Sequence, residues 1–310
     1  MDVICIVGPT AVGKTRLGVE LARRLDGEVI SGDSMQIYRG MDIGTAKATA
    51  EERQGVPHHL LDEKNPGEDY SVALFQQSVR AKITEIKNRG KIPIIVGGTG
   101  LYIKAVLYDY EFAQGESRSK AADEEKYGHL DNESLHGLLR GVDPQAAAEI
   151  HPNNRKRLMR ALEIFEQTGE NKSSLIQKQE HKLLYDAVLI GLSDERALLY
   201  RRIDDRVDAM MENGLLDEVR ALFNAGILEG SQAMRAIGYK ELYPYFRGEG
   251  DLSVSVDLIK RNSRRYAKRQ FTWFKNQMEV NWFQVNVKNF PETVNEIELF
   301  IKKAHLQGIQ

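Results

Sequence analysis

Short apolar runs recur along the chain, and helix-like periodicity fills most of the gaps between them. The runs expected to form buried strands are residues 3–7, 28–31, 92–96, 187–192 and 280–285. The first run is followed by a segment, 16–25, in which Leu17, Leu21 and Leu25 share one helical face. This alternation of strands and helices predicts an α/β fold with a parallel sheet flanked by helices.

Further helices are expected later in the chain. They cover residues 72–86, 195–225, 253–278 and 291–306. Ser71 can cap the first of them, and Gly214 marks a break in the second. Residues 36–55 show no clear period and are predicted to form a loop with short helices.

The segment from about 112 to 186 differs, because it is polar, helix-prone and poor in apolar runs. Helices are predicted over 144–150 and 155–168. We therefore expect two domains: a core made of residues 1–112 and 187–310, and a helical insertion made of residues 113–186.

Composition narrows the class of protein. The 310 residues include 42% hydrophobic and 28% charged residues, as in globular proteins. With 43 basic and 45 acidic residues the net charge is −2, so nucleic-acid binding would need local patches. The single cysteine, Cys5, is expected to be a core residue, without a disulfide. The chain shows neither a membrane-length apolar stretch nor a leader, so a cytoplasmic protein is expected.

The turn after the first strand carries the strongest motif, Gly, four residues, Gly-Lys-Thr. Its residues are Gly8, Pro9, Thr10, Ala11, Val12, Gly13, Lys14 and Thr15. Backbone N–H groups, a helix N-terminus and the Lys14 ammonium would surround phosphate oxygens, and the Thr15 hydroxyl could hold Mg²⁺. The alternative is an ordinary strand-to-helix turn. The motif makes the core a phosphate-loop domain, but it does not tell ATP or GTP from another diphosphate.

Two more strand ends carry candidate residues. Asp33 and Ser34 follow the second strand, and Gly-Gly-Thr at 97–99 follows the third. Because parallel strands end at a common edge, these residues should join the phosphate loop in one active site. Asp33 fits a general base, a Mg²⁺ ligand acting through water, or a turn residue. The glycine pair, where motor ATPases have an acidic residue, favours a group-transfer enzyme.

Two segments are strongly basic. Six of the ten residues 260–269 are Lys or Arg, and at about 100° per residue they occupy one half of a helix, opposite Ala267, Phe271 and Phe274. Acidic partners at four-residue spacing are missing, which favours contact with a phosphate backbone over a solvated face. Arg155 to Arg157, with Arg160, form a second cluster that fits an RNA-clamping face and a solvated helix equally well.

Arg202 and Arg206 lie at helical spacing. One of them could reach a diphosphate leaving group, but an ion pair with a neighbouring aspartate fits the spacing equally well. His58, His59 and His151 show no metal-binding pattern.

Together, nine motifs resemble those of the bacterial tRNA dimethylallyltransferases, or isopentenyltransferases. They follow the family's order over nearly the whole chain: GPTAVGKT at 8–15, SGDSMQIY at 31–38, MDIGTAK at 41–47, PHHLLD at 57–62, GGTGLY at 97–102, HPNN at 151–154, RALE at 160–163, AIGYKE at 236–241 and AKRQFTWF at 267–274. The resemblance implies transfer of a dimethylallyl group from dimethylallyl diphosphate to the exocyclic amine of the adenine next to the anticodon, with release of diphosphate.

The same resemblance implies roles for single residues. Lys14 and Thr15 would contact the donor diphosphate with Mg²⁺, Thr10 would line the donor site, and Arg202 would steady the diphosphate. Asp33 matches the family's general base. Contacts to the tRNA anticodon stem-loop are implied for Asp33, Ser34, Met35, Gln36, Thr99, Arg157, Leu158, Met159, Arg160 and Ala161, and the basic segment adds Arg264, Arg265 and Lys268.

Two departures from the family's pattern stand out. Family members carry a tRNA-positioning arginine after the GGTGLY helix, and in the divergent segment here Arg118 is the nearest candidate. Larger eukaryotic relatives add a C-terminal zinc finger that this chain lacks, so zinc is not expected.

Two kinds of function compete. The first is a tRNA prenyltransferase that acts as a monomer. The second is a small-molecule enzyme on the same scaffold, such as an ATP-dependent kinase or an adenylate prenyltransferase. The basic segments favour the first, because a free nucleotide needs neither of them. The phosphate loop disfavours a third class, a non-catalytic RNA-binding module.

Overall fold

The computed structural model describes residues 1–112, 120–177 and 182–307. They form two compact units: Met1–Tyr108 with Leu183–Gln310, and Asp109–Lys182. We call the first the core unit and the second the insertion unit. The sequence-based boundaries fall at residues 112 and 187, a few residues further along the chain at each junction.

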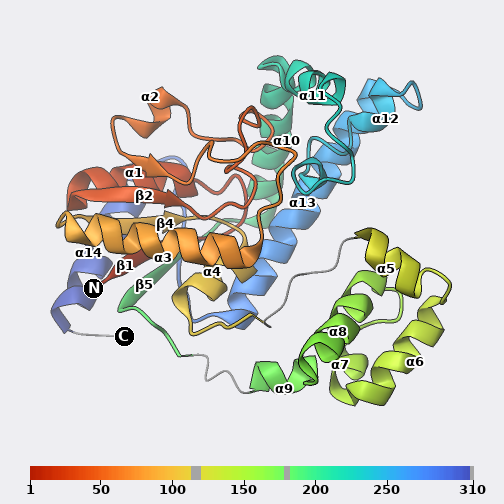
Figure 1. Ribbon diagram of the computed structural model, residues 1–310. Helices are drawn as coiled ribbons and strands as arrows, with labels where there is room; N and C mark the ends of the chain where they lie inside the picture. Colours follow the sequence, from red (N-terminus) through yellow and green to blue (C-terminus); the bar gives the residue numbers. More distant parts are fainter. Residues whose placement is uncertain (113–119, 178–181, 308–310) are drawn as a thin grey trace. The chain divides into compact units, whose positions relative to one another are not determined.

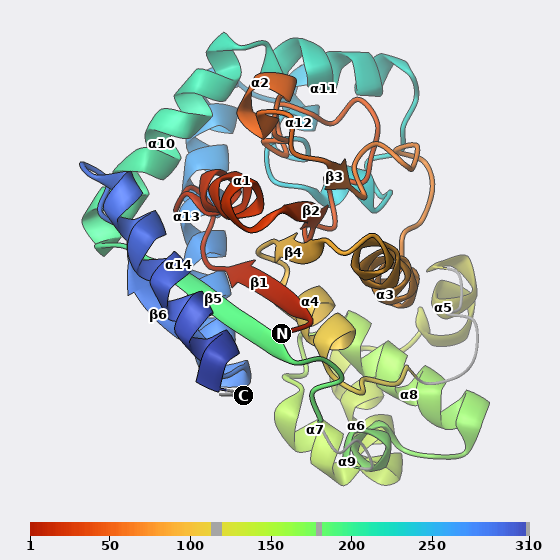
Figure 2. The ribbon, with the colours of Figure 1, turned by 90° about the vertical axis from the view of Figure 1, so that its left-hand side faces the viewer.

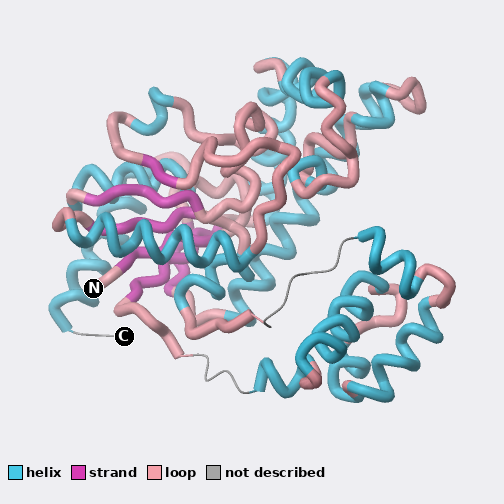
Figure 3. Tube along the Cα trace, in the orientation of Figure 1, coloured by secondary structure: helices cyan, strands magenta, loops and turns pink. Residues whose placement is uncertain are grey.

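The core unit is built on a six-stranded parallel sheet with the order β3-β2-β4-β1-β5-β6. The strands are β1 (Val3–Val7), β2 (Gly27–Ser31), β3 (His58–His59), β4 (Ile92–Val96), β5 (Ala187–Ser193) and β6 (Asn281–Gln284). Figure 3 shows them gathered in the middle of the unit. The predicted α/β fold and its five strands are confirmed. The short strand β3 was missed, because two histidines make no apolar run.

Nine α-helices are described in the core unit, and Figure 1 shows their course. They are α1 (Lys14–Leu25), α2 (Ala50–Arg53), α3 (Val72–Asn88), α4 (Gly100–Leu107), α10 (Arg196–Glu212), α11 (Leu215–Asn224), α12 (Tyr243–Phe246), α13 (Leu252–Gln277) and α14 (Phe290–Gln307). The predicted cap of α3 is present, because the Ser71 hydroxyl accepts the N–H of Leu74 at 3.2 Å. Gly214 separates α10 from α11 as expected.

Both faces of the sheet are covered, so its central strands are almost wholly apolar. On one face Ile4 and Ile6 of β1 pack with α1 and α14. On the other face Cys5 and its neighbours pack with α3 and α4. Figure 2 shows these two helix pairs on opposite sides of β1. Cys5 is fully buried, as predicted, and burial raises the pKa of its thiol.

The insertion unit is described as helical throughout. Its helices are α5 (Lys120–Tyr127), α6 (Asn132–Val142), α7 (Pro144–Glu149), α8 (Arg155–Thr168) and α9 (Lys172–Gln177). Leu139 of α6 and Leu158 and Leu162 of α8 form part of a separate small core. The buried carboxylate of Asp143 accepts the N–H and hydroxyl of Ser173, which joins α7 to α9. Only α7 and α8 were predicted.

Within the described residues, no helix combines the length and the apolar character needed to cross a bilayer.

Candidate active site

The phosphate loop joins β1 to α1. Gly8 has a φ of 138°, and a Cβ there would lie 2.6 Å from the Leu192 carbonyl oxygen of β5, so only glycine fits this position. Helix α1 begins at Lys14, and its first-turn N–H groups have no partner within the helix. The Lys14 ammonium donates to the carbonyl of Pro9 at 2.7 Å. The loop therefore has the geometry of an anion-binding site.

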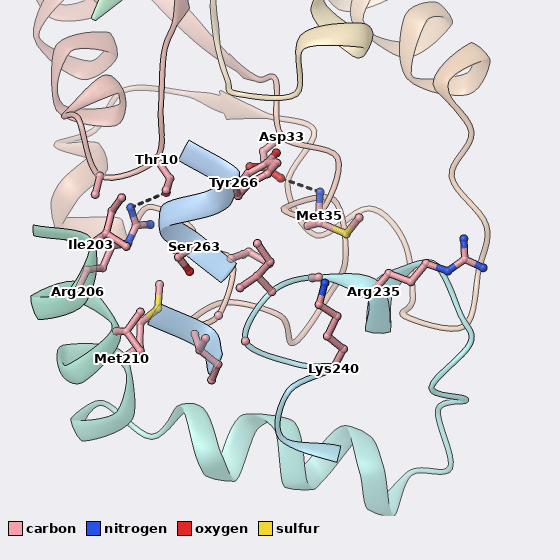
Figure 4. A pocket seen from close by; sticks show the side chains of 18 of the residues that line it. Thr10, Asp33, Met35, Ile203, Arg206, Met210, Arg235, Lys240, Ser263 and Tyr266 are labelled. Carbon is pink, nitrogen blue, oxygen red and sulfur yellow. Dashed lines mark hydrogen bonds between the residues drawn. The ribbon is translucent and has the colours of Figure 1, made fainter. Parts of the chain in front are cut away.

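Two cavities meet beside this loop. The larger, of about 930 Å³, is lined by the phosphate loop, Asp33, Arg202 and Arg206 among others. The smaller, of about 270 Å³, is shown in Figure 4 and includes side chains of α10, α13 and the turn before α12. The residues common to both walls are Thr10, Ala11, Asp33, Thr45, Arg206, Met210 and Tyr266. Asp33 thus lies where a ligand in one cavity can meet a ligand in the other.

The Asp33 carboxylate follows β2 at the carboxyl edge of the sheet, as predicted. Its Oδ1 accepts the N–H of Met35 at 2.9 Å, which fixes the side chain in the turn (Figure 4). Burial raises the pKa of Asp33, and the Met35 bond and the positive charges of Lys14 and Arg206 oppose that rise. A carboxylate with a raised proton affinity suits proton abstraction.

Several cationic groups line the larger cavity, and Lys14, Arg202 and Arg206 are among them. Burial, and then repulsion from Arg206, lowers the pKa of Lys14 to about 7. Nη1 of Arg206 donates to Oγ1 of Thr10 at 3.4 Å, so this arginine reaches the phosphate loop. Arg202 lines the same cavity, and its Nη2 lies 2.5 Å from a buried oxygen of Asp194. The structure thus contains the aspartate ion pair for Arg202 and the loop contact for Arg206.

One carboxylate holds in place a loop that forms part of the wall of the smaller cavity. Glu218 of α11 accepts the backbone N–H groups of Asp42, Ile43 and Gly44 at 2.8, 2.8 and 3.0 Å. It also accepts the hydroxyl of Tyr239 at 2.6 Å. Gly44 lines the smaller cavity. These four bonds fix the loop after β2, which the sequence marked only as irregular.

The residues implied to contact an extruded base lie close to this site. Ser34 and Met35 line the smaller cavity, and Gln36 lines the larger. The amide of Gln36 is already engaged, since it accepts from Ser31 and donates to Thr45. The hydroxyl oxygen of Thr99 is buried without a hydrogen-bond partner among the described residues. These roles stay predictions.

Several residues of α13 that line the cavities were not predicted as site residues, and Tyr266 and Gln270 are among them. Tyr266 lines both cavities, and burial together with the charge of Asp33 raises the pKa of its phenol to about 12. Gln270 lines the larger cavity and is buried. A polar residue on the apolar face of α13, beside Ala267 and Phe274, was the available signal for Gln270.

The basic segment of α13 is not free of acidic partners, which corrects the expectation of uncompensated repulsion. Nζ of Lys260 lies 2.7 Å from Oδ2 of Asp208, and Arg264 pairs with Asp204. Both aspartates come from α10, so spacing within α13 could not reveal them. Arg261, Arg265 and Lys268 are exposed and form no ion pair within the described residues.

The packed side of α13 also needs a correction. Ala267 and Phe274 are buried as predicted, but Phe271 is 37% exposed. Its ring lies against Trp282, at a centroid distance of 4.9 Å.

The stretch from Arg157 to Ala161 lies in the insertion unit. Leu158 and Ala161 are buried in the core of that unit, so their side chains cannot contact RNA. Arg160 pairs with Glu163 at 2.7 Å, and Arg157 is exposed. The Met159 side chain packs against the same core.

Two further residues of the insertion, Arg155 and Arg118, were also singled out in the sequence. Arg155, from the basic cluster, donates to the carbonyls of Tyr127 and Leu130 and so holds the unit together. Arg118 lies outside the described residues.

Two side chains in the larger cavity have oxygen atoms of the kind that bind Mg²⁺. The Thr15 hydroxyl and the Asp33 carboxylate both line this cavity, and both are oxygen ligands of the kind that Mg²⁺ takes. No cluster of three or more His, Cys, Asp or Glu residues suited to a metal exists in the described parts of the chain. Mg²⁺ sites completed by phosphate oxygens do not need such a cluster.

The fold and the site together define a phosphate-loop protein that holds a partly buried carboxylate beside an anion-binding loop. Comparison with known proteins narrows this class. Residues 36–277 match the family described as IPP transferase. The chain belongs to this IPP transferase family.

Similar proteins with high identity support the assignment. The chain is 53% identical to the tRNA dimethylallyltransferase of Geobacillus thermodenitrificans, over 96% of each chain. The solved tRNA delta(2)-isopentenylpyrophosphate transferase of Staphylococcus epidermidis is 45% identical, with a TM-score of 0.72, and the match covers 97% of this chain and 98% of that one. A eukaryotic dimethylallyltransferase solved acting on tRNA is 28% identical, with a TM-score of 0.86, and the match covers 99% of this chain and 79% of that one.

Proposed function

We propose that this protein transfers a dimethylallyl group from dimethylallyl diphosphate to the exocyclic amine of the adenine next to the anticodon in tRNA. The observation that carries the proposal is the position of Asp33, in the shared wall of the two cavities. One cavity has the phosphate loop that a diphosphate needs. The other, of about 270 Å³, also borders Asp33 and would receive the adenine that is modified.

The donor diphosphate lies against the phosphate loop in this proposal. Loop N–H groups, Lys14 and Arg206 stabilise the charge that grows on the diphosphate as it departs. Arg202 contributes as far as its bond to Asp194 allows. Bound Mg²⁺, held by Thr15 and the diphosphate, would supply further charge neutralisation.

The acceptor amine is activated by Asp33. The nitrogen lone pair forms the new bond to the allylic carbon, while the carbon–oxygen bond breaks and its electron pair leaves with diphosphate. The proton released from the nitrogen passes to the Asp33 carboxylate, whose raised pKa favours accepting it. Thr10 lines the reaction space and is fixed by Arg206.

The adenine must leave the stacked anticodon loop to reach the site, and this calls for contacts to the surrounding RNA backbone. In the core unit the exposed Arg265 and Lys268 of α13 suit this purpose. In the insertion unit the exposed Arg157 is suitable. We propose that the protein acts on tRNA in the cytoplasm and as a monomer.

An adenylate prenyltransferase is the competing function, because it would share the donor loop and the base. Incubation with labelled dimethylallyl diphosphate and Mg²⁺, with unmodified tRNA or with AMP, separates the two. Label should enter tRNA and not AMP. Label in AMP alone would overturn the proposal. Light scattering with and without tRNA measures the molecular mass and so tests whether the protein is a monomer.

A further inference from the structure

One buried side chain bridges the two halves of the active site. Gln270 of α13 is 5% exposed. Its Oε1 accepts the N–H of Thr10, in the phosphate loop, at 2.9 Å. Its Nε2 donates to the carbonyl of Gly98, in the turn that follows β4, at 3.0 Å. Each bond needs a different end of the carboxamide, so the pair of bonds also fixes its orientation.

The backbone at Gly98 is shaped around this side chain. A Cβ at position 98 would lie 2.1 Å from Nε2 of Gln270 and 3.4 Å from the carbonyl oxygen of Gly8. Glycine is therefore required for α13 to approach β4 and the phosphate loop this closely. The next residue, Thr99, carries the buried hydroxyl without a partner.

We propose that Gln270 is a positioning residue that holds the phosphate loop and the end of β4 in register, so that donor and acceptor meet at Asp33. The inference rests on the proposed function, since it concerns the alignment of that reaction. Thr10 belongs to the donor side, and Gly98 precedes a residue implied to contact the acceptor RNA. Only a group with both a donor and an acceptor can bind these two backbone atoms at once.

The position of Gln270 on α13 extends this role. The same helix exposes Arg265 and Lys268, which precede Gln270 by five and two residues. RNA that binds these residues therefore binds the helix that braces the phosphate loop. As long as Gln270 keeps its two hydrogen bonds, a constraint that bound RNA places on α13 is transmitted to Thr10 in the phosphate loop.

The test compares Gln270→Leu and Gln270→Glu with Gln277→Leu and Gln277→Glu. Gln277 is an exposed glutamine at the end of the same helix, so it is a matched control. Gln270→Leu loses both bonds. Gln270→Glu keeps an acceptor for Thr10 but loses the donor to Gly98. The measurements are Tm, binding of inorganic diphosphate with Mg²⁺, and kcat and KM for donor and tRNA.

We expect kcat to fall about 10- to 100-fold in both Gln270 variants, since a misplacement of about 1 Å has that effect. Diphosphate binding should weaken more in Gln270→Leu than in Gln270→Glu, because only the latter keeps the Thr10 bond. The Gln277 variants should match the wild type. A lower Tm with unchanged kcat and unchanged diphosphate binding would overturn the proposal.

A double substitution gives a second, independent test. Gly98→Ala should lower kcat in the wild type, because the new methyl group displaces Gln270. In a Gln270→Ala background the space is free, so the same change should have a much smaller effect. Equal effects in both backgrounds would contradict the inference. The binding of diphosphate to the Gln270 variants requires no RNA. That measurement therefore tests the role of Gln270 even if the wild type transfers nothing to tRNA.

Discussion

The core unit contains two groups of charged residues in opposite environments. Lys14, Asp33 and Arg206 line cavities, and burial shifts the pKa of each. Arg261, Arg265 and Lys268 lie exposed on α13 and form no ion pair within the described residues. In a cavity of low dielectric constant each charge acts strongly on its neighbours, while exposed charges are screened by salt. We therefore expect a single substitution in the cavities to have a larger effect than a single substitution on the exposed side of α13.

The largest effect is expected at Asp33. Asp33→Ala should lower kcat about 10²–10⁴-fold, because no other carboxylate of the described residues lines both cavities. Donor affinity should stay near that of the wild type, as measured by calorimetry with dimethylallyl diphosphate. Asp257→Ala, an exposed site on α13, is the control. A large loss of donor affinity would indicate that Asp33 mainly serves the metal.

The pH profile follows from the same carboxylate. Only ionised Asp33 can accept a proton, and burial raises its pKa above that of an exposed aspartate. The kcat should therefore fall with decreasing pH at a higher pH than the usual aspartate value. An unchanged kcat down to pH values near about 4 would contradict this role.

The next largest effect is expected at Lys14. Lys14→Met should weaken donor binding about 10²–10³-fold, through the loss of a positive charge in the cavity proposed to hold the diphosphate. The ligand-free protein should instead become more stable. The folded pKa of about 7 lies below the ordinary value of 10.5, so charged Lys14 opposes folding, and this penalty shrinks as pH rises from 7 to 10.5.

Calorimetry of the ligand-free proteins checks this sign. At pH 7 the Lys14→Met variant should have a Tm roughly 2–4 °C above that of the wild type. The difference should shrink toward pH 10. A lower Tm at pH 7 would show that Lys14 stabilises the empty loop, through its bond to Pro9 for example.

Two arginines that line the larger cavity, Arg206 and Arg202, differ in their partners and should therefore differ in their effects. Arg206→Gln should lower kcat/KM about 10- to 100-fold, because Arg206 contacts Thr10 and has no ion-pair partner in the described residues. Arg202→Gln should affect kcat/KM less and Tm more, since it leaves the 3%-exposed Asp194 carboxylate without its partner. The reverse order in kcat/KM would assign the diphosphate to Arg202.

The smallest effect is expected on the exposed side of α13. Arg265→Glu should raise the KM for tRNA about 3- to 10-fold and reduce its salt dependence, without a change in Tm. The neighbouring Arg264 pairs with Asp204, so Arg264→Glu should lower the Tm by roughly 2–4 °C. An unchanged KM for tRNA in Arg265→Glu would leave that residue a merely solvated charge.

The parts of the fold that rest on local sequence were predicted well. Buried parallel strands such as β1 and β4 are continuous apolar runs, so their positions follow from the sequence. The phosphate loop is a contiguous motif, and Asp33 follows a strand end directly. Strand β3, with only two polar residues, has no such pattern.

The parts that rest on distant contacts were not predicted. Gln270 binds a residue 260 positions away, and Arg264 pairs with an aspartate 60 positions away. No periodicity within α13 contains these partners. The insertion shows the same limit, since Leu158 and Ala161 belong to a motif but are buried in the core of their unit.

The most direct test of the account concerns the nucleophile. Two tRNAs are prepared that differ in one base: one carries adenosine next to the anticodon, and the other carries purine riboside, which lacks the exocyclic amine. With labelled dimethylallyl diphosphate and Mg²⁺, the account predicts label in the first tRNA alone, with similar binding of both. Equal labelling of both tRNAs, or labelling of neither, would contradict it.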